Sequence, residues 1–128
     1  MEYDLEKRTL KFSKSVVNYL SKIGKTTINK PLILQLVRSA TSVGANYREA
    51  NNASSKKDFT NKISISKKEI NETKYWIELL AEILPENEKK DLRDIWQEAK
   101  ELTLIFNKIY YNSKNKKPTE EFPEEIKQ

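Results

Sequence analysis

Residues 59–84 read FTNKISISKKEINETKYWIELLAEIL, and this stretch decides the fold. Its apolar and small residues recur at alternating steps of four and three, the spacing of a helix that buries one continuous stripe. Ser55, just before the stretch, and Asp58 three residues later resemble a capping box that opens the helix. The stretch therefore predicts one long amphipathic helix. Its stripe consists of Phe59, Ile63, Ser66, Ile70, Thr73, Ile77, Leu80 and Leu84.

Helical periodicity of the same kind continues on both sides of this segment. Residues 5–23 carry an apolar stripe at steps of three and four. Pro31 suits the first turn of a second helix, where its missing N–H costs nothing. Gly44 lies on the apolar stripe of that second helix, so we expect it to allow close approach by another helix. The acidic residues from Glu86 to Glu88 suit the positive end of the dipole of a fourth helix.

The connections between these four segments are short, which forces neighbouring helices to run antiparallel. The sequence thus predicts an all-α, up-down-up-down four-helix bundle over residues 1–112. Residues 113–128 mix charge blocks with prolines and few apolar residues, so we expect a flexible C-terminal tail there.

Composition excludes several kinds of chemistry. The 128 residues include no cysteine and no histidine, which removes thiol nucleophiles, imidazole bases, disulfides and the common zinc sites. The two glycines are too far apart for a phosphate-binding loop. We expect no enzyme, cofactor, metal or small-molecule substrate; an enzyme would have only carboxylates and tyrosines to work with.

No apolar run approaches the roughly 20 residues that span a bilayer, and residues 1–4 are acidic rather than basic. We therefore expect a cytoplasmic protein without a membrane partner.

Charge is unevenly distributed along the chain. Residues 1–68 hold 14 Lys and Arg against 5 Asp and Glu, a net charge of +9, whereas residues 69–128 hold 10 against 14, a net charge of −4. Such asymmetry is typical of an anion-binding face, usually for nucleic acid, and also of a molecule that packs head to tail against copies of itself. A solvated lysine-rich surface is the third interpretation.

Two strings, RSATSVGAN at residues 38–46 and ETKYWIELL at residues 72–80, carry a family resemblance. Over residues 4–112 the chain resembles the bacterial four-helix-bundle family first named for proteins encoded within intervening sequences of 23S rRNA genes. That family is similar in fold to the accessory variability determinant of diversity-generating retroelements, a pentameric bundle that binds nucleic acid and a reverse transcriptase. The resemblance implies a homo-oligomer, a pentamer being one form, that binds RNA, DNA or a nucleic-acid-associated protein. It implies no reaction.

Asn46 and Glu49 match the family's motif in the second helix. The amide of Asn46 flanks the apolar stripe and is expected to bond to another helix, and Glu49 to pair with a lysine or arginine of the third or first helix. A polar pair that fixes helix register is one interpretation of these residues. A contact with a ligand or RNA is the other.

The third helix also carries a polar strip away from its apolar stripe, and arginines follow a polar stripe of the second helix. Lysines and amides spaced along a rod can contact successive phosphates, with affinity that depends on salt more than on sequence. The alternatives are pairing with carboxylates across a subunit interface, and a protein–protein scaffold without nucleic-acid contact. The strip comprises Lys57, Asn61, Ser64, Lys68, Asn71 and Tyr75. The candidate nucleic-acid-binding residues are Arg38, Arg48, Lys56, Lys57, Lys62, Lys67, Lys68 and Lys74.

Overall fold

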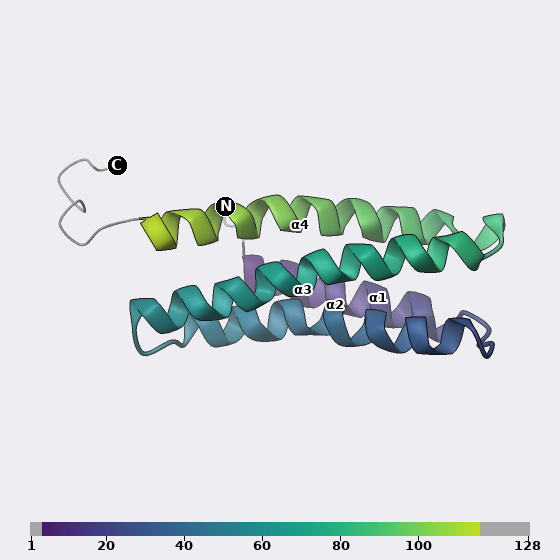
Figure 1. Ribbon diagram of the computed structural model, residues 1–128, viewed down its shortest axis with the longest axis horizontal. Coiled ribbons are helices and arrows are strands. Elements are labelled where there is room, and N and C mark those ends of the chain that lie inside the picture. The colour runs from purple at the N-terminus through teal and green to yellow at the C-terminus, as the bar shows by residue number, and fades with distance from the viewer. Residues whose placement is uncertain (1–3, 116–128) are drawn as a thin grey trace.

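The computed structural model describes residues 4–115 and shows four long helices joined by short connections (Figure 1). Successive helices run antiparallel, so the predicted all-α four-helix bundle is confirmed. A short 3-10 turn precedes the last helix. The elements are α1 (Leu5–Ser21), α2 (Asn29–Asn51), α3 (Lys56–Ile83), η1 (Glu86–Glu88) and α4 (Lys90–Asn115).

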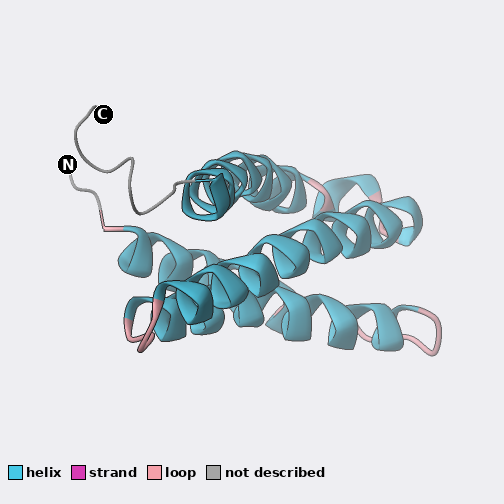
Figure 2. Cartoon of the chain, turned by 60° about the vertical axis from the view of Figure 1, so that its left-hand side comes forward, coloured by secondary structure: helices cyan, strands magenta, loops and turns pink. Residues whose placement is uncertain are grey.

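The helices contact one another unequally. Among the neighbouring helices, the contact between α2 and α3 is the most extensive, and that between α1 and α4 is the least. In Figure 2, α4 is seen partly along its own axis while α3 is seen from the side, so α4 is inclined to α3. The bundle is therefore tightest around α3 and loosest between its first and last helices.

The buried stripe of α3 follows the predicted register. Ile63, Ile70 and Leu80 are completely buried, and Phe59, at the helix start, is half-buried. Removing each large aliphatic side chain from water stabilises the fold by roughly 1.5–3 kcal/mol, which makes this stripe the main source of stability along the helix.

Two hydroxyl groups on the same stripe bond across to α2. The Ser66 hydroxyl donates to the Val43 carbonyl at 2.9 Å, and the Thr73 hydroxyl donates to the Ser39 hydroxyl at 3.0 Å. Ser39, Ser66 and Thr73 are all completely buried, so these bonds satisfy polar groups that have lost water. They also fix the axial position of α3 against α2, because a shift along either helix would break them.

The helix starts show one confirmed cap and one unforeseen cap. The Ser55 hydroxyl accepts the Asp58 N–H at 3.0 Å, as the capping-box pattern predicts. The second helix begins at Asn29, two residues before Pro31. The Asn29 side-chain oxygen accepts the Thr26 N–H at 2.7 Å, and the Thr26 hydroxyl accepts the Asn29 N–H at 3.0 Å. This reciprocal pair satisfies N–H groups at the start of α2.

Gly44 lies where α1 crosses α2. A Cβ atom at position 44 would lie 3.0 Å from the Thr9 hydroxyl oxygen and 3.1 Å from Thr9 Cβ. Thr9 is itself buried and its hydroxyl bonds to the carbonyls of its own helix, so it cannot move aside easily. The expected close approach is confirmed.

The fourth helix continues to Asn115, three residues past the predicted end of the bundle. Near its end the Ser113 and Thr60 hydroxyls form a hydrogen bond between α4 and α3. Residues 116–128, which make up the remainder of the predicted tail, lie outside the described residues. Across residues 4–115 we find no helix that is both long and apolar enough to cross a membrane.

Candidate nucleic-acid interface

The polar strip predicted on the third helix lies on the solvent-facing side of α3. All six of its residues are exposed, and we call them the outer strip: Lys57, Asn61, Ser64, Lys68, Asn71 and Tyr75. Because they follow steps of four and three, they form one straight row of about 27 Å along the helix.

The outer strip presents cations, amides and one aromatic ring. Lys57 and Lys68 have no hydrogen bond or ion pair with any residue within 4–115. A shallow trough lies beside the row, and its walls include Ser64, Asn71 and Tyr75. The Tyr75 ring packs edge-on against Trp76 with centroids 5.0 Å apart, yet its other side faces solvent. Lysines can neutralise phosphates, and an exposed ring can stack on a base.

The other lysines beside the strip differ in their surroundings. The ammonium group of Lys67 lies 5.1 Å from the centre of the Tyr110 ring of α4, a cation–π contact. Lys74 is half-buried, and Lys56 is exposed at the start of α3. Of the predicted lysines, Lys57 and Lys68 are thus the best placed to meet a ligand.

The predicted arginines bond to carboxylates within the chain. Arg38 donates to Glu72 at 3.0 Å and lies 3.8 Å from Glu69, which joins α2 to α3. The Arg48 side chain lies 3.6 Å from the Glu6 carboxylate of α1. Phosphate binding by either arginine would require exchange of these ion pairs, so the arginines are weaker candidates than the sequence suggests.

The polar residues of the family motif have separate partners. The Lys62 ammonium group lies 2.7 Å from the Glu49 carboxylate, and this bond raises the pKa of Lys62. The expected pairing of Glu49 with the third helix is confirmed. The expectation for Asn46 is wrong: its amide donates to the Ser42 carbonyl at 2.9 Å, within its own helix. A side chain that follows its own helix axis reaches the carbonyl four residues back before it reaches a neighbouring helix.

The bonds that fix helix register are those of Ser39, Ser66 and Thr73, which the prediction of a polar pair at Asn46 and Glu49 did not name. The sequence already contained a pattern from which these hydrogen bonds could have been predicted. Ser66 and Thr73 occupy stripe positions, where a buried hydroxyl must find a partner on its own helix or on the facing one. Thr73 does both, since its hydroxyl also lies 2.8 Å from the Glu69 carbonyl of its own helix.

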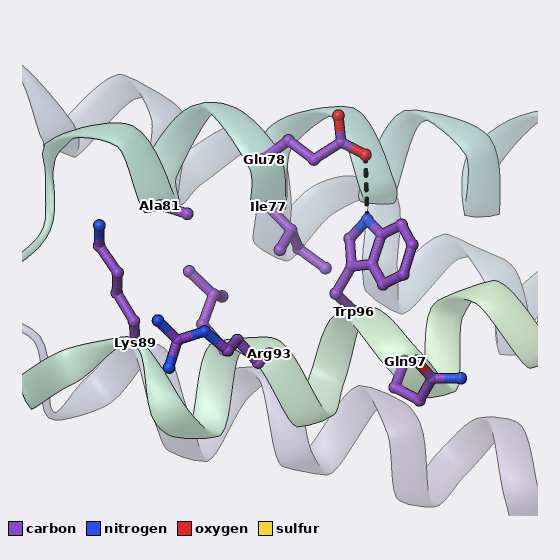
Figure 3. Close-up of a pocket in the computed structure, with 8 residues that line it drawn as sticks. Ile77, Glu78, Ala81, Lys89, Arg93, Trp96 and Gln97 are labelled. Carbon is purple, nitrogen blue, oxygen red and sulfur yellow. Dashed lines mark hydrogen bonds between the residues drawn. The ribbon is translucent and has the colours of Figure 1, made fainter. Parts of the chain in front are cut away.

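A groove of about 410 Å³ opens between the end of α3 and the start of α4 (Figure 3). Ile77, Ala81 and Leu92 line it, and the Trp96 indole N–H donates to the Glu78 carboxylate across it at 3.0 Å. Its lining holds no nucleophile paired with a base. Within residues 4–115, no three acidic side chains are grouped so that they could hold a metal ion.

The chain resembles proteins whose role is not established. Residues 1–108 match the family model described as 23S rRNA-intervening sequence protein. A crystal structure of a protein with unknown function from the S23 ribosomal protein family of Bacteroides thetaiotaomicron VPI-5482 is 34% identical and superposes with a TM-score of 0.70. The alignment covers 84% of this chain and 98% of that one. No curated protein matches the chain.

Proposed function

The chain belongs to the family of 23S rRNA-intervening sequence proteins, and on that premise we propose that it is a non-enzymatic, homo-oligomeric module that binds RNA through the outer strip of α3. The observation that carries the proposal is the exposure of all six strip residues in one straight row. The positive charge of the first 68 residues supports it, since a basic surface attracts polyanions over a distance.

The strip favours contact with the phosphate backbone. Lys57 and Lys68 are separated by about 16 Å along the helix, with Asn61 and Ser64 between them as hydrogen-bonding groups. Such a row recognises the backbone rather than base sequence. If three phosphates of a single strand are neutralised, the logarithm of the affinity falls with the logarithm of the salt concentration with a slope of about −2.

The test is a titration of labelled single-stranded RNA, hairpin RNA and duplex DNA with the purified protein at low and moderate salt. We expect binding at low salt, and a loss of at least about tenfold in the double variant Lys57→Glu/Lys68→Glu. The double variant Lys90→Glu/Lys108→Glu is the control, because it makes the same charge change and both lysines are exposed on α4, away from the strip. Absence of binding to every probe, or an equal loss in the double variant and in a control with the same charge change, would overturn the proposal.

The alternative is a protein-binding scaffold without direct nucleic-acid contact. The ion pairs of Arg38 and Arg48 favour it, because they use within the chain the groups best suited to phosphate. Under this alternative the double lysine variant leaves any weak nucleic-acid affinity unchanged.

A further inference from the structure

Two apolar surfaces of the described chain face solvent and have opposite charged surroundings. The first is on α3, where Tyr75, Leu79 and Ile83 are 58%, 37% and 45% exposed; we call it the α3 apolar patch. The second is on the outer side of α1, where Leu10 and Val17 are 42% and 44% exposed. Large apolar side chains grouped in this way are typical of interaction surfaces.

The α3 apolar patch shares Tyr75 with the outer strip and continues it toward the end of the helix, so docking covers Tyr75 and leaves the strip from Lys57 to Asn71 open to RNA. Its three side chains follow steps of four and cover about 12 Å of the helix. Glu78 and Glu82 line the shallow hollow beside Tyr75 and Leu79, and both are exposed. The patch is therefore apolar with an acidic border.

Leu10 forms one wall of a groove of about 470 Å³ between α1 and α2. The remainder of its lining is mostly small, with Ser13 on α1 and Thr41, Gly44 and Ala45 on α2, so larger side chains from another molecule can enter. Val17 lies two turns from Leu10 on the same side of α1, outside the groove, and extends the exposed apolar surface of α1 about 10 Å beyond Leu10.

The exposed side of α1 next to the groove is basic, whereas the border of the patch is acidic. Lys7 and Lys14 are exposed on α1 on either side of Leu10 and make no ion pair within residues 4–115. The charged residues that line the groove itself are Glu6, Arg48 and Glu49, of which Arg48 pairs with Glu6, and Glu49 with Lys62. The unpaired charge beside Leu10 is therefore positive.

We propose that the α3 apolar patch of one copy docks into the α1–α2 groove of a second copy. The apolar side chains of the α3 apolar patch and those of Leu10 and Val17 cover similar lengths, and the exposed carboxylates beside the patch complement the exposed lysines beside Leu10. Both surfaces point outward from one rigid bundle, so the chain cannot join them to each other. The contact is heterologous: each docked copy leaves one patch or one groove open for the next, which leads to a ring or a filament. This inference rests on the homo-oligomer of the proposed function and names its interface.

Two variants test the pairing without disturbing the core. Leu79→Arg breaks the patch, and Leu10→Glu breaks the groove; both side chains are exposed, so both variants should unfold like the wild type. Light scattering should give assemblies for the wild type and 15.0 kDa monomers for each variant alone. Leu104→Arg is the control, because Leu104 is 63% exposed on α4, outside both surfaces, and its variant should assemble normally.

Mixing the two variants gives the decisive result. Leu79→Arg keeps an intact groove and Leu10→Glu keeps an intact patch, so an equimolar mixture should form a species of twice 15.0 kDa and nothing larger. A mixture that stays monomeric, a single variant that still assembles, or a wild type that is monomeric overturns the inference.

Assembly and RNA binding are separate measurements in these experiments. The light scattering contains no RNA, so normal assembly together with absent RNA binding overturns the RNA proposal and leaves the interface standing. A wild type that stays monomeric but binds RNA through Lys57 and Lys68 overturns the interface and leaves RNA binding by the outer strip standing.

Discussion

Two seams of the bundle, α2 against α3 and α1 against α4, are held by different kinds of contact. Between α2 and α3, contact is most extensive and the hydroxyls of Ser39 and Thr73 meet in a completely buried layer. Between α1 and α4, contact is least extensive, and a groove of about 460 Å³ opens beside Phe12 and Ile95. The α2–α3 seam is closed by packing, with the ion pairs of Arg38 and of Lys62 added at its margins. The α1–α4 seam has little packing and depends on the polar groups at its margins.

The polar bridges of the α1–α4 seam are few but specific. Arg8 donates to Glu98 at 2.7 and 2.9 Å and to Glu101 at 2.8 Å, and these carboxylates raise the pKa of Arg8. At the other end of α1, the Tyr19 hydroxyl donates at 2.6 Å to the Glu88 carbonyl of η1, the turn that leads into α4. Such contacts respond to salt and pH, whereas buried apolar contacts do not. The α1–α4 seam should therefore open before the α2–α3 seam does.

The largest effect is expected from a cavity in the buried stripe. Ile70→Ala should lower the free energy of unfolding by about 2–5 kcal/mol, because the side chain is completely buried among core residues. Ile65→Ala on the outer side of the same helix is the matched control and should cost less than about 1 kcal/mol. Urea unfolding monitored by circular dichroism measures both. Equal losses would contradict a stability centred on the α3 stripe.

The α1–α4 side of the bundle should lose stability as pH rises. Burial raises the pKa of Tyr19 to about 12, with smaller contributions from the charges of Glu88 and Asp91. The neutral hydroxyl is favoured in the folded state, so its contribution is complete below the unfolded pKa of 10.0 and is lost as pH rises toward 12. The loss amounts to roughly 2–3 kcal/mol.

Tyr19→Phe removes this pH dependence. Unfolding free energies of both proteins should be compared from neutral pH to strongly alkaline pH. At neutral pH the variant should be less stable by about 1 kcal/mol, since it loses one hydrogen bond. The difference between the two proteins should shrink and then reverse in sign as pH rises. A constant difference would show that Tyr19 titrates normally.

A smaller effect is expected from the buried hydroxyl pair. Thr73→Val should cost about 1–2 kcal/mol, because it leaves the Ser39 hydroxyl with only a long bond of 3.4 Å to the Leu36 carbonyl. The double variant Ser39→Ala/Thr73→Val should cost less than the sum of the single variants, since no partner then remains unsatisfied. Additive losses in urea unfolding would mean that the two hydroxyls do not stabilise each other.

The smallest effect is expected from the ion pairs. Arg8→Ala should lower the free energy of unfolding by less than about 1 kcal/mol at low salt, because the pairs are partly exposed. At about 1 M salt most of that loss should disappear, since the Debye length falls to about 3 Å. Hydrogen exchange should show the amides of α1 near Arg8 exchanging faster in the variant. Unchanged protection there would mean that packing alone holds the α1–α4 seam.

Sequence periodicity predicted the α2–α3 seam better than the α1–α4 seam. The register of the α3 stripe and the close approach at Gly44 follow from steric rules that act along one helix, and both are confirmed. The start of α2 differs because Thr26 and Asn29 satisfy its first N–H groups before Pro31 is reached. Periodicity does not report how far two helices separate, so it gave no sign of the groove beside Phe12.

The candidate site was also predicted only in part, because the spacing of residues along one helix does not report where the neighbouring helices lie. Spacing placed the outer strip on one face, and all its members are exposed. Spacing could not assign partners to Arg38 or Arg48, because a long side chain reaches several neighbours and the choice depends on the position of the next helix. For Asn46 the carbonyl of Ser42 in its own helix competed with the neighbouring helix. The exposure of Leu10 and Val17 could not be predicted either. The sequence pattern of one helix does not distinguish a second apolar stripe that packs on a neighbour from one that faces solvent.

The length of α3 has a consequence for a bound strand. Its 28 residues form one continuous rod of about 42 Å that carries the outer strip at one end and the α3 apolar patch at the other. When the patch is fixed on a neighbour, the direction of Lys57 and Lys68 relative to that neighbour is fixed too. Successive copies would then repeat their cations at a constant interval, and a strand held by one copy would meet the next at millimolar effective concentration.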